Sequence, residues 1–244
     1  MDSFTRLNAA VVACRKCPRL VAYREDVARA KVRRYRDEEY WGKPIPGFGD
    51  PRARLLIVGL APAAHGGNRI GRIFTGDRSG DFLFVALHRA GFANQPSSRH
   101  RGDGLRLQDC YITAAARCAP PENKPTLVEL TACRHYLVEE LRLLSRVRVV
   151  VALGRIAFEA FLKAWVEAGG ELPAARPQFG HDRMAEVPGG LRLLASYHPS
   201  QQNTQTGRLT AEMFEQIFVH ARQLLTAPKT GQPPTGIRKK GQKR

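Results

Sequence analysis

Four short apolar runs stand out along the chain, separated by longer segments in which apolar and polar positions mix. Runs of this length, rich in Leu, Val, Ile and Ala, are typical of strands buried on both faces of a parallel sheet. The predicted strands are residues 54–58, 111–115, 147–153 and 191–197.

Helical periodicity occupies the segments around these strands. Its clearest boundary is Thr126, because Thr126 and Glu129 have the spacing of a capping box at a helix N-terminus. The predicted helices are residues 5–17, 19–35, 81–90, 155–165 and 210–225, with one more that begins at Thr126. Strands separated by helices predict an α/β fold, a three-layer α/β/α sandwich with a central, mostly parallel four-stranded sheet.

The 244 residues carry a formal net charge of +17 and suit a single domain. We expect that domain at residues 1–226, followed by a basic, disordered tail at residues 227–244. The tail holds six positive residues and no acidic one, so subtracting six from +17 leaves +11 on the domain. A body this basic favours a polyanionic partner, bound through phosphate contacts.

The N-terminal sequence MDSFTRLNAAVVACRKC lacks the uninterrupted apolar stretch of a signal peptide. No run approaches the roughly 20 apolar residues that are needed to span a bilayer. We therefore expect a cytoplasmic protein with no membrane partner, whose thiols stay reduced.

Four of the five cysteines fall into two pairs. Cys14 and Cys17 are spaced C-x2-C, which lets two side chains grip one metal centre across a single turn, and Cys118 and Cys133 are spaced C-x14-C. The spacing is compatible both with zinc and with an iron–sulfur cluster. Cys110, beside the second strand, is interpreted as a small core residue.

Two polar loops follow the first and the last predicted strand, where parallel sheets build their active sites. The first, residues 59–80, is rich in glycine but is neither a Walker A loop nor a dinucleotide fingerprint, and the second is residues 198–207. Their candidate ligand-binding side chains are His65, Asn68, Arg69, Arg72, Phe74, Asp77, His198, Ser200, Gln202, Asn203 and Thr204. We expect both loops to converge on one ligand.

The loops carry long motifs: GLAPAAHGGNR and FTGD after the first strand, and HPSQQNTQTG after the last. Together with YITAAARCAPPENKPT and the four paired cysteines, these motifs resemble the uracil-DNA glycosylase superfamily, in its iron–sulfur branch called family 5 or type B. The resemblance extends over nearly the whole chain, to about Leu225. It implies a monofunctional DNA glycosylase of base excision repair, monomeric and nucleoid-associated, which flips a damaged base out of DNA and hydrolyses its N-glycosidic bond.

The resemblance also implies roles for individual residues. Cys14, Cys17, Cys118 and Cys133 would ligate a structural [4Fe–4S] cluster. Phe74 would stack on the flipped base, and His198 would stabilise the negative charge that develops on its O2 oxygen. The implied substrate-binding set is Ala61, Pro62, Ala63, Ala64, His65, Phe74, Ala114 and Asn203, and the implied DNA-binding set is Asn68, Arg69, Arg72, Ser200, Gln202 and Thr204.

Asp77 is the only acidic residue inside either loop. Cleavage leaves a cationic sugar and needs an attacking water, so we assign Asp77 to both tasks, with His198 as the second catalytic residue. The alternative for Asp77 is a cap on the helix that begins near Ser79. Phe74 likewise has an alternative as a core residue, and His65 as a loop residue bonded to the backbone.

Two positions depart from related branches of the superfamily. Leu60 and Ala61 stand where other branches carry an acidic residue that handles the attacking water, and Ala114 stands where others use an Asn to read uracil. Losing that reader predicts relaxed selectivity. Hypoxanthine, xanthine and modified uracils are then expected substrates beside uracil.

Two other classes of function stay open at the level of sequence. A non-catalytic nucleic-acid-binding module, with a metal site held by four cysteines, explains the charge and the cysteines but not the two polar loops. An enzyme acting on small nucleotides explains the glycine-rich loop but leaves the positive charge of the body without a purpose.

Overall fold

The computed structural model describes residues 2–227, so the predicted tail, apart from its first residue, lies outside the described residues. At its centre is one sheet of six strands in the order β1-β3-β2-β4-β6-β5. The strands are β1 (Phe48–Gly49), β2 (Leu55–Gly59), β3 (Cys110–Ala114), β4 (Val149–Leu153), β5 (Arg183–Val187) and β6 (Leu191–Ser196). The four inner strands run parallel, and β1 and β5 are antiparallel edges. The predicted α/β class and mostly parallel sheet are confirmed.

The sequence predicted four strands, and the sheet has six among the described residues. The two strands that were not predicted are the edge strands β1 and β5. β1 has only two residues, which is too short to produce a periodic pattern. β5 reads RMAEV and is largely exposed, so it has no apolar run. Edge strands pair on one side only, and the buried apolar pattern that identifies central strands is therefore weak in them.

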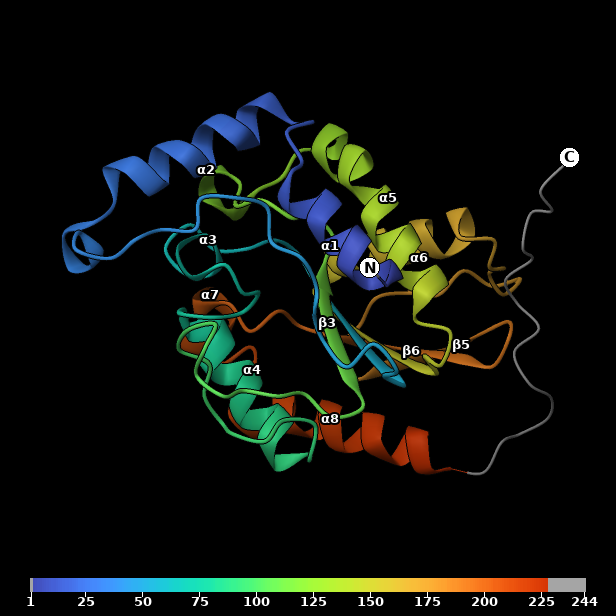
Figure 1. The fold of residues 1–244 in the computed structure, drawn as a ribbon. Helices are drawn as coiled ribbons and strands as arrows, with labels where there is room; N and C mark the ends of the chain where they lie inside the picture. Colours follow the sequence, from blue (N-terminus) through green and yellow to red (C-terminus); the bar gives the residue numbers. More distant parts are fainter. Residues whose placement is uncertain (1, 228–244) are drawn as a thin grey trace, which may run out of the picture.

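Helices cover both faces of the sheet, as Figure 1 shows. On one face α1 packs on α5 and α5 on α6, while α8 lies on the other face with α4 packed against it. The helices are α1 (Ser3–Val12), α2 (Pro18–Ala30), α3 (Gly67–Ile70), α4 (Arg78–Arg89), α5 (Leu127–Leu143), α6 (Arg155–Glu167), α7 (Gln201–Gln205) and α8 (Ala211–Thr226), with short 3-10 turns η1 (Arg33–Tyr35) and η2 (Pro121–Asn123). The predicted three-layer sandwich is present.

Successive residues of the inner strands feed two separate cores. In β2, Leu55 and Ile57 pack with α4 and α8, whereas Leu56 and Val58 pack with α5 and α6. Side chains alternate between the faces of a strand, and both faces here are covered by helices. This explains why the inner strands read as continuous apolar runs.

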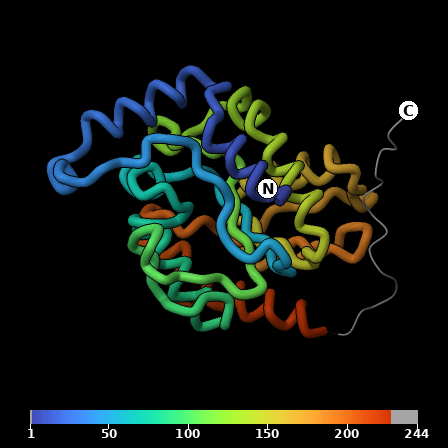
Figure 2. The backbone as a smooth tube through the Cα atoms, viewed as in Figure 1, coloured from blue at the N-terminus to red at the C-terminus, as the bar shows by residue number. Residues whose placement is uncertain are grey.

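Capping residues begin the helices where the sequence predicts. The capping box of Thr126 and Glu129 is formed at the start of α5. The predicted helix 19–35 is shorter, because α2 ends at Ala30 and Lys31 has a φ of 49°. Figure 2 shows α2 projecting from the layers before the chain turns back towards β1. Among the described helices, none is long and apolar enough to cross a membrane.

Candidate active site and metal centre

The four parallel strands have their carboxyl ends on the same side of the sheet. Gly59 of β2 lies opposite Ala114 of β3, and Leu153 of β4 lies opposite Ser196 of β6. The loops that leave β2 and β6 lead into α3 and α7, which lie at the same end of the molecule in Figure 1. The predicted convergence of the two polar loops is therefore present.

Phe74 and His198 lie against each other at the carboxyl ends of these strands. Their ring centroids are 6.2 Å apart and their planes are inclined by 30°. Two glycines make room for them: a Cβ on Gly59 would lie 2.7 Å from ring carbons of Phe74, and a Cβ on Gly154 would lie 3.3 Å from Cβ of His198. Phe74 is 8% exposed and belongs to the buried core, so its alternative as a core residue holds, with a small part of its surface left open.

His198 is a neutral imidazole at physiological pH. Burial lowers its pKa to about 4, because the charged form loses hydration. Among residues 2–227, no side chain or backbone group hydrogen-bonds to either ring nitrogen. Asn203 fixes the loop instead, since its Nδ2 donates to the carbonyl of His198 at 2.8 Å. The ring nitrogens of His198 are thus available to a ligand, and the amide nitrogen of Asn203 is committed to the loop.

Asp77 caps α4. Its Oδ1 accepts a hydrogen bond from the backbone N–H of Gly80 at 2.9 Å. Its Oδ2 lies against Gly66, where a Cβ would come within 2.3 Å. Burial raises the pKa of Asp77, and backbone hydrogen bonds at the cap partly offset that effect. The cap alternative is correct, and it leaves the second oxygen directed at the loop after β2.

The loop after β2 presents backbone donors. In the part of the chain that the structure describes, the N–H groups of Ala63, Ala64 and His65 have no acceptor. The carbonyl of Ala63 accepts from Asn68 at 3.0 Å, which turns the chain into α3. The His65 ring contacts the hydroxyl of Tyr40 at 3.1 Å. Adjacent free N–H groups in a loop of this kind suit an anionic or carbonyl oxygen.

Arg72 requires a correction, because it is a structural residue. It is 5% exposed and forms two hydrogen bonds with Asp103, at 2.6 and 2.9 Å. It also donates to Ser98 at 2.7 Å and to Thr75 at 3.1 Å. These contacts occupy the guanidinium, so Arg72 is not a phosphate contact as the sequence suggested.

The predicted DNA-binding roles of Arg69 and Asn68 need the same correction, because both side chains are buried. Arg69 is 7% exposed, forms an ion pair with Glu38, donates to the carbonyl of His65 at 2.8 Å and lies 3.8 Å from the ring centroid of Tyr35. Asn68 is 1% exposed and donates to a carbonyl of α2 at 3.1 Å. The short helix α3 turns both side chains inwards, which the polar composition of the loop did not reveal.

The other predicted DNA-binding residues lie on α7 or directly before it. Ser200 caps this helix through a hydrogen bond from the N–H of Asn203 to its hydroxyl at 3.4 Å. Thr204 donates back to the carbonyl of Ser200 at 3.1 Å, and Gln202 is exposed. Gln202 is thus exposed to solvent on the side of the sheet where the strands have their carboxyl ends, which is also where His198 lies.

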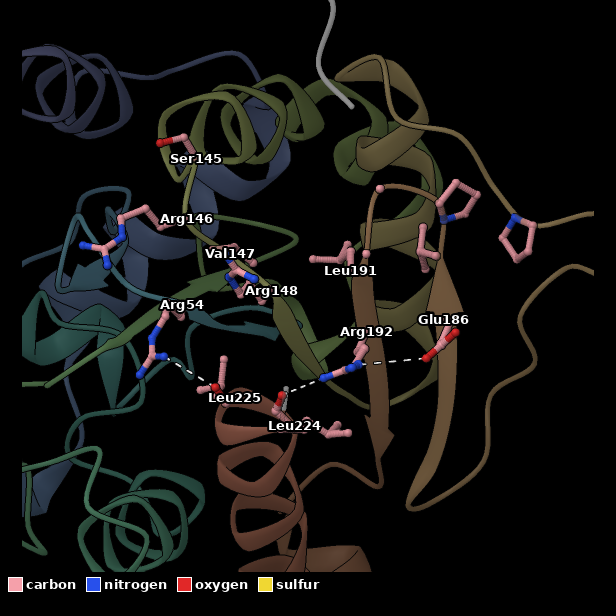
Figure 3. Close-up of a pocket in the computed structure, with 16 residues that line it drawn as sticks. Arg54, Ser145, Arg146, Val147, Arg148, Glu186, Leu191, Arg192, Leu224 and Leu225 are labelled. Carbon is pink, nitrogen blue, oxygen red and sulfur yellow. Dashed lines mark hydrogen bonds and ion pairs between the residues drawn. The ribbon is translucent and has the colours of Figure 1, made fainter. Parts of the chain in front are cut away.

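A separate groove of about 740 Å³ lies at the amino ends of β2, β4 and β6 (Figure 3). The polar loops leave the other ends of β2 and β6. Four arginines line it: Arg54, Arg146, Arg148 and Arg192. Arg54 and Arg192 donate to the last carbonyls of α8, those of Leu225 at 3.5 Å and Leu224 at 2.6 Å. These two arginines neutralise a helix C-terminus, and the groove is remote from the polar loops.

The four paired cysteines line one small enclosed cavity. Cys14 and Cys17 come from the turn between α1 and α2, Cys118 follows β3, and Cys133 lies on α5. None of them forms a disulfide, and Cys110 is instead fully buried in β3, as expected of a core residue. Two cysteines accept N–H donors at sulfur: Cys118 from the Arg24 guanidinium at 2.9 Å and Cys133 from a backbone N–H at 3.3 Å.

The chemistry of this cavity fits a centre held by four thiolates. Its remaining lining is mainly apolar, with two buried arginines. Within residues 2–227, no three His, Cys, Asp or Glu side chains come together as ligands of a single ion. A tetrahedral zinc site has metal–sulfur distances of about 2.3 Å and needs tightly grouped sulfurs. The four cysteines around one cavity are a donor set that both zinc and iron–sulfur clusters use.

Sequence reasoning missed Arg24. It lies on α2 one turn beyond Val21, on the face that also carries Leu20, and it is 2% exposed. The available signal was an arginine seven residues after Cys17, on the helix face that starts at this cysteine. It was obscured because the whole segment is rich in basic residues.

Residues 46–222 match the model of the Uracil DNA glycosylase superfamily. The chain therefore belongs to the uracil-DNA glycosylase superfamily. Within it, the chain is 56% identical over 214 residues to the type-5 uracil-DNA glycosylase of Thermus thermophilus, covering 88% of this chain and 94% of that protein. It is 52% identical over 223 residues to the type-5 enzyme of Mycobacterium tuberculosis, covering 91% and 82%. The type-4 uracil-DNA glycosylase of Pyrobaculum aerophilum is more distant, with 29% identity over 196 residues, which cover 80% of this chain and 82% of that enzyme.

Proposed function

We propose that this protein is a monofunctional DNA glycosylase that removes uracil from DNA by flipping the base and hydrolysing its N-glycosidic bond. The observation that carries the proposal is the Phe74–His198 pair at the edge where four parallel strands end. The family assignment and the basic body of the chain support it. DNA containing a deaminated base is the partner, and the protein acts as a monomer.

Phe74 receives the flipped base. A base cannot react inside the duplex, so it must leave the stack and find a new surface. An aromatic ring repays part of the unstacking, about 1–3 kcal/mol for one base. The φ of 52° at Phe74 and the missing Cβ at Gly59 hold this ring at the strand edge.

His198 and the loop after β2 stabilise the departing base. The base leaves as an anion, and its oxygen needs donors that are already oriented. A neutral His198 donates one N–H, and the unpaired N–H groups of Ala63, Ala64 and His65 supply others. The donors and the Phe74 ring come from the loops that leave β2 and β6. Donors that are already oriented need little reorganisation during the reaction.

Asp77 stabilises the cationic sugar and orients the attacking water. Its Oδ1 is bound at the helix cap, which fixes the carboxylate, and Oδ2 remains for the substrate side. A carboxyl whose pKa is raised by burial is a better base for water than an ordinary one. The cap and the chemistry are therefore two uses of one side chain.

Selectivity is relaxed around Ala114. This residue is 1% exposed beside Gly59 and offers a methyl group where an amide would read the Watson–Crick edge of uracil. Hypoxanthine, xanthine and modified uracils are therefore substrates as well. Ala61 and Pro62, in the loop after β2, complete the proposed base-binding surface.

DNA phosphates are held by exposed groups around the site. Ser200, Gln202 and Thr204 lie on or beside α7. Arg101 lies 4.4 Å from the ring centroid of Trp41, which gives a second rim of cation and aromatic character. These exposed groups replace the buried Arg69 and Arg72 in the binding surface.

Cys14, Cys17, Cys118 and Cys133 hold a [4Fe–4S] cluster. When bound, the cluster supplies a structural cross-link between the turn before α2, the segment after β3, and α5. The cysteines themselves bring three distant segments to one cavity, and their thiolates replace the disulfides that a reducing compartment does not allow. The domain spans residues 1–226, with a basic tail after it.

The test is incubation of the full-length protein with duplex DNA that carries one uracil. Free uracil and an unbroken strand with one abasic site are the expected products. Binding without base release would leave a non-catalytic nucleic-acid-binding module. Release from free nucleotides, undiminished by an excess of undamaged DNA, would indicate an enzyme of small nucleotides.

A further inference from the structure

Arg24 is a buried cation at the four-cysteine cavity. Its Nη1 donates to Sγ of Cys118 at 2.9 Å, and both terminal nitrogens lie 3.3 Å from the carbonyl of Cys14. The side chain is 2% exposed. It therefore contacts two of the four paired cysteines directly, one of them through the sulfur.

The protein itself provides little compensation for this charge. The only carboxylate that pairs with Arg24 among the described residues is Glu25, at 3.7 Å and with a side chain 38% exposed. Nε of Arg24 is buried and has no hydrogen-bond partner among them. A buried charge costs several kcal/mol unless it is paired and hydrogen-bonded. A group in the cavity with negative charge and sulfur acceptors would supply both.

The neighbouring buried arginine is different. Arg117 forms an ion pair with Glu140, and both side chains are 1% exposed. Thr113 also donates to Glu140 at 2.6 Å, while Nε and Nη1 of Arg117 have no hydrogen-bond partner among the described residues. Its charge is balanced without the cysteines. Arg24 is thus the buried cation at the cavity whose counter-charge is missing from the protein.

We propose that Arg24 is a positioning residue for the cluster, acting as its counter-charge and as a hydrogen-bond donor to the Cys118 thiolate. This inference rests on the proposed [4Fe–4S] cluster. Hydrogen bonds to ligand sulfurs and nearby positive charge stabilise the more negative, reduced state of such a centre and raise its potential. Arg24 therefore sets both the retention and the potential of the cluster.

The same contact couples the cluster to α2. Cys17 is the residue directly before this helix, and Leu20, Val21 and Arg24 form the buried face of the helix over the cavity. Binding energy of a metal centre is folding energy for the segments that hold it. Arg24 and the cysteines consequently dock α2 on the body, although the helix projects from the layers in Figure 2.

The test compares three full-length variants with the wild type, each loaded with iron and sulfide. Arg24→Gln removes the charge and keeps one donor group. Arg24→Lys keeps the charge and loses the fork of donors. Arg29→Gln is the matched control, since Arg29 lies on the same helix as Arg24 but its side chain is 78% exposed, pairs with Asp26 and is screened by water. The measurements are iron release to a chelator and the midpoint potential of the cluster.

Arg24→Gln should release iron about tenfold faster or more, as is typical when a group supporting a metal ligand is lost. Its reduced-to-oxidised ratio at fixed potential should fall about tenfold, which equals about 59 mV for one electron. Arg24→Lys should release iron faster than wild type but retain much of the midpoint potential, and Arg29→Gln should resemble wild type.

Wild-type rates and potential in Arg24→Gln would overturn the inference while leaving the cluster assignment intact. Wild-type protein that takes up no iron or sulfide would remove the cluster assignment and this inference with it. If Arg24→Gln does not fold, Arg24→Lys decides: iron release at the wild-type rate contradicts the role.

Discussion

The imidazole of His198 and the ring of Phe74 lie 6.2 Å apart, centroid to centroid, with their planes inclined by 30°. One side chain follows the last inner strand of the chain and the other belongs to the loop after the first. The pair therefore combines an aromatic surface with a neutral donor, which a flipped base needs at the same moment. Its geometry depends on glycines whose missing side chains leave the space.

Gly59→Ala should disturb Phe74 without a backbone conflict at Gly59 itself. The new Cβ would lie 2.7 Å from the ring, so the ring must move. A displacement of about 1 Å at a reacting site costs on the order of 100-fold in rate. Single-turnover uracil release measures the effect. Gly102→Ala is the matched control, because its Cβ would meet nothing closer than 3.7 Å, and equal rates for both variants would contradict the role of the ring.

Asp77→Asn separates the cap from the chemistry. Asn is about as good an N-cap as Asp, so the melting temperature should stay close to that of wild type. Base release should fall about 10²–10⁴-fold, because the carboxylate is lost. Asp77→Ala should lose the same activity and, in addition, about 1 kcal/mol of stability. Full activity in Asp77→Asn would reduce Asp77 to a cap.

Asp77 also shapes the pH dependence of the reaction. Burial raises its pKa, and the active form is the carboxylate. The rate should therefore decline as pH falls through this raised pKa, at a higher pH than an exposed Asp would give. A pH profile of single-turnover release measures the decline. An acid limb at the position of an ordinary Asp would contradict the assignment.

His198 should make the free energy of unfolding depend on pH. Its pKa is lowered to about 4 in the folded protein, whereas an exposed histidine titrates at about 6.5. Between these pH values the unfolded chain binds more protons than the folded protein does. The free energy of unfolding is therefore undiminished by His198 above about pH 6.5, and it falls as the pH drops towards 4. Urea denaturation of wild type and His198→Gln across this range measures the difference. Parallel pH dependences would show that His198 is not held neutral.

Arg72 and Arg101 should behave oppositely. Burial alone would raise the pKa of Asp103, but hydrogen bonds from Arg72 and from backbone N–H groups hold it far below its usual value. Removing Arg72 leaves a buried carboxylate unpaired, so Arg72→Ala should cost about 3–5 kcal/mol of stability. DNA binding by the folded variant should keep its salt dependence. Arg101→Ala should leave the free energy of unfolding unchanged. The slope of the logarithm of the DNA-binding constant against the logarithm of the salt concentration should become shallower by about one.

The sequence predicted the inner sheet and the helix caps because local patterns determine them. Strands buried on both faces read as apolar runs, and the capping box of Thr126 needs only its own turn. Side-chain direction in the glycine-rich loop was not predictable in this way. The partners that draw Arg72 and Arg69 inwards, Asp103 and Glu38, lie 31 residues away in each case.

The cysteine cavity shows the same limit. Pairing of the four cysteines followed from their spacing and from the family motifs, and their convergence on one cavity agrees with it. Arg24 gave no comparable signal, since its burial depends on the docking of α2. Long-range contacts of this kind need the tertiary fold before they can be identified.

The central claim is that Phe74 and His198 together handle a flipped base. Its most direct test is single-turnover release of uracil from duplex DNA by wild type, Phe74→Ala and His198→Ala, all confirmed to be folded. The account predicts rapid release by wild type and a loss of at least about 100-fold in His198→Ala, the typical effect of removing one oriented donor. Phe74→Ala should release uracil more slowly than wild type. Release at the wild-type rate by either variant would contradict the assigned pair, and no release by wild type would contradict the glycosylase itself.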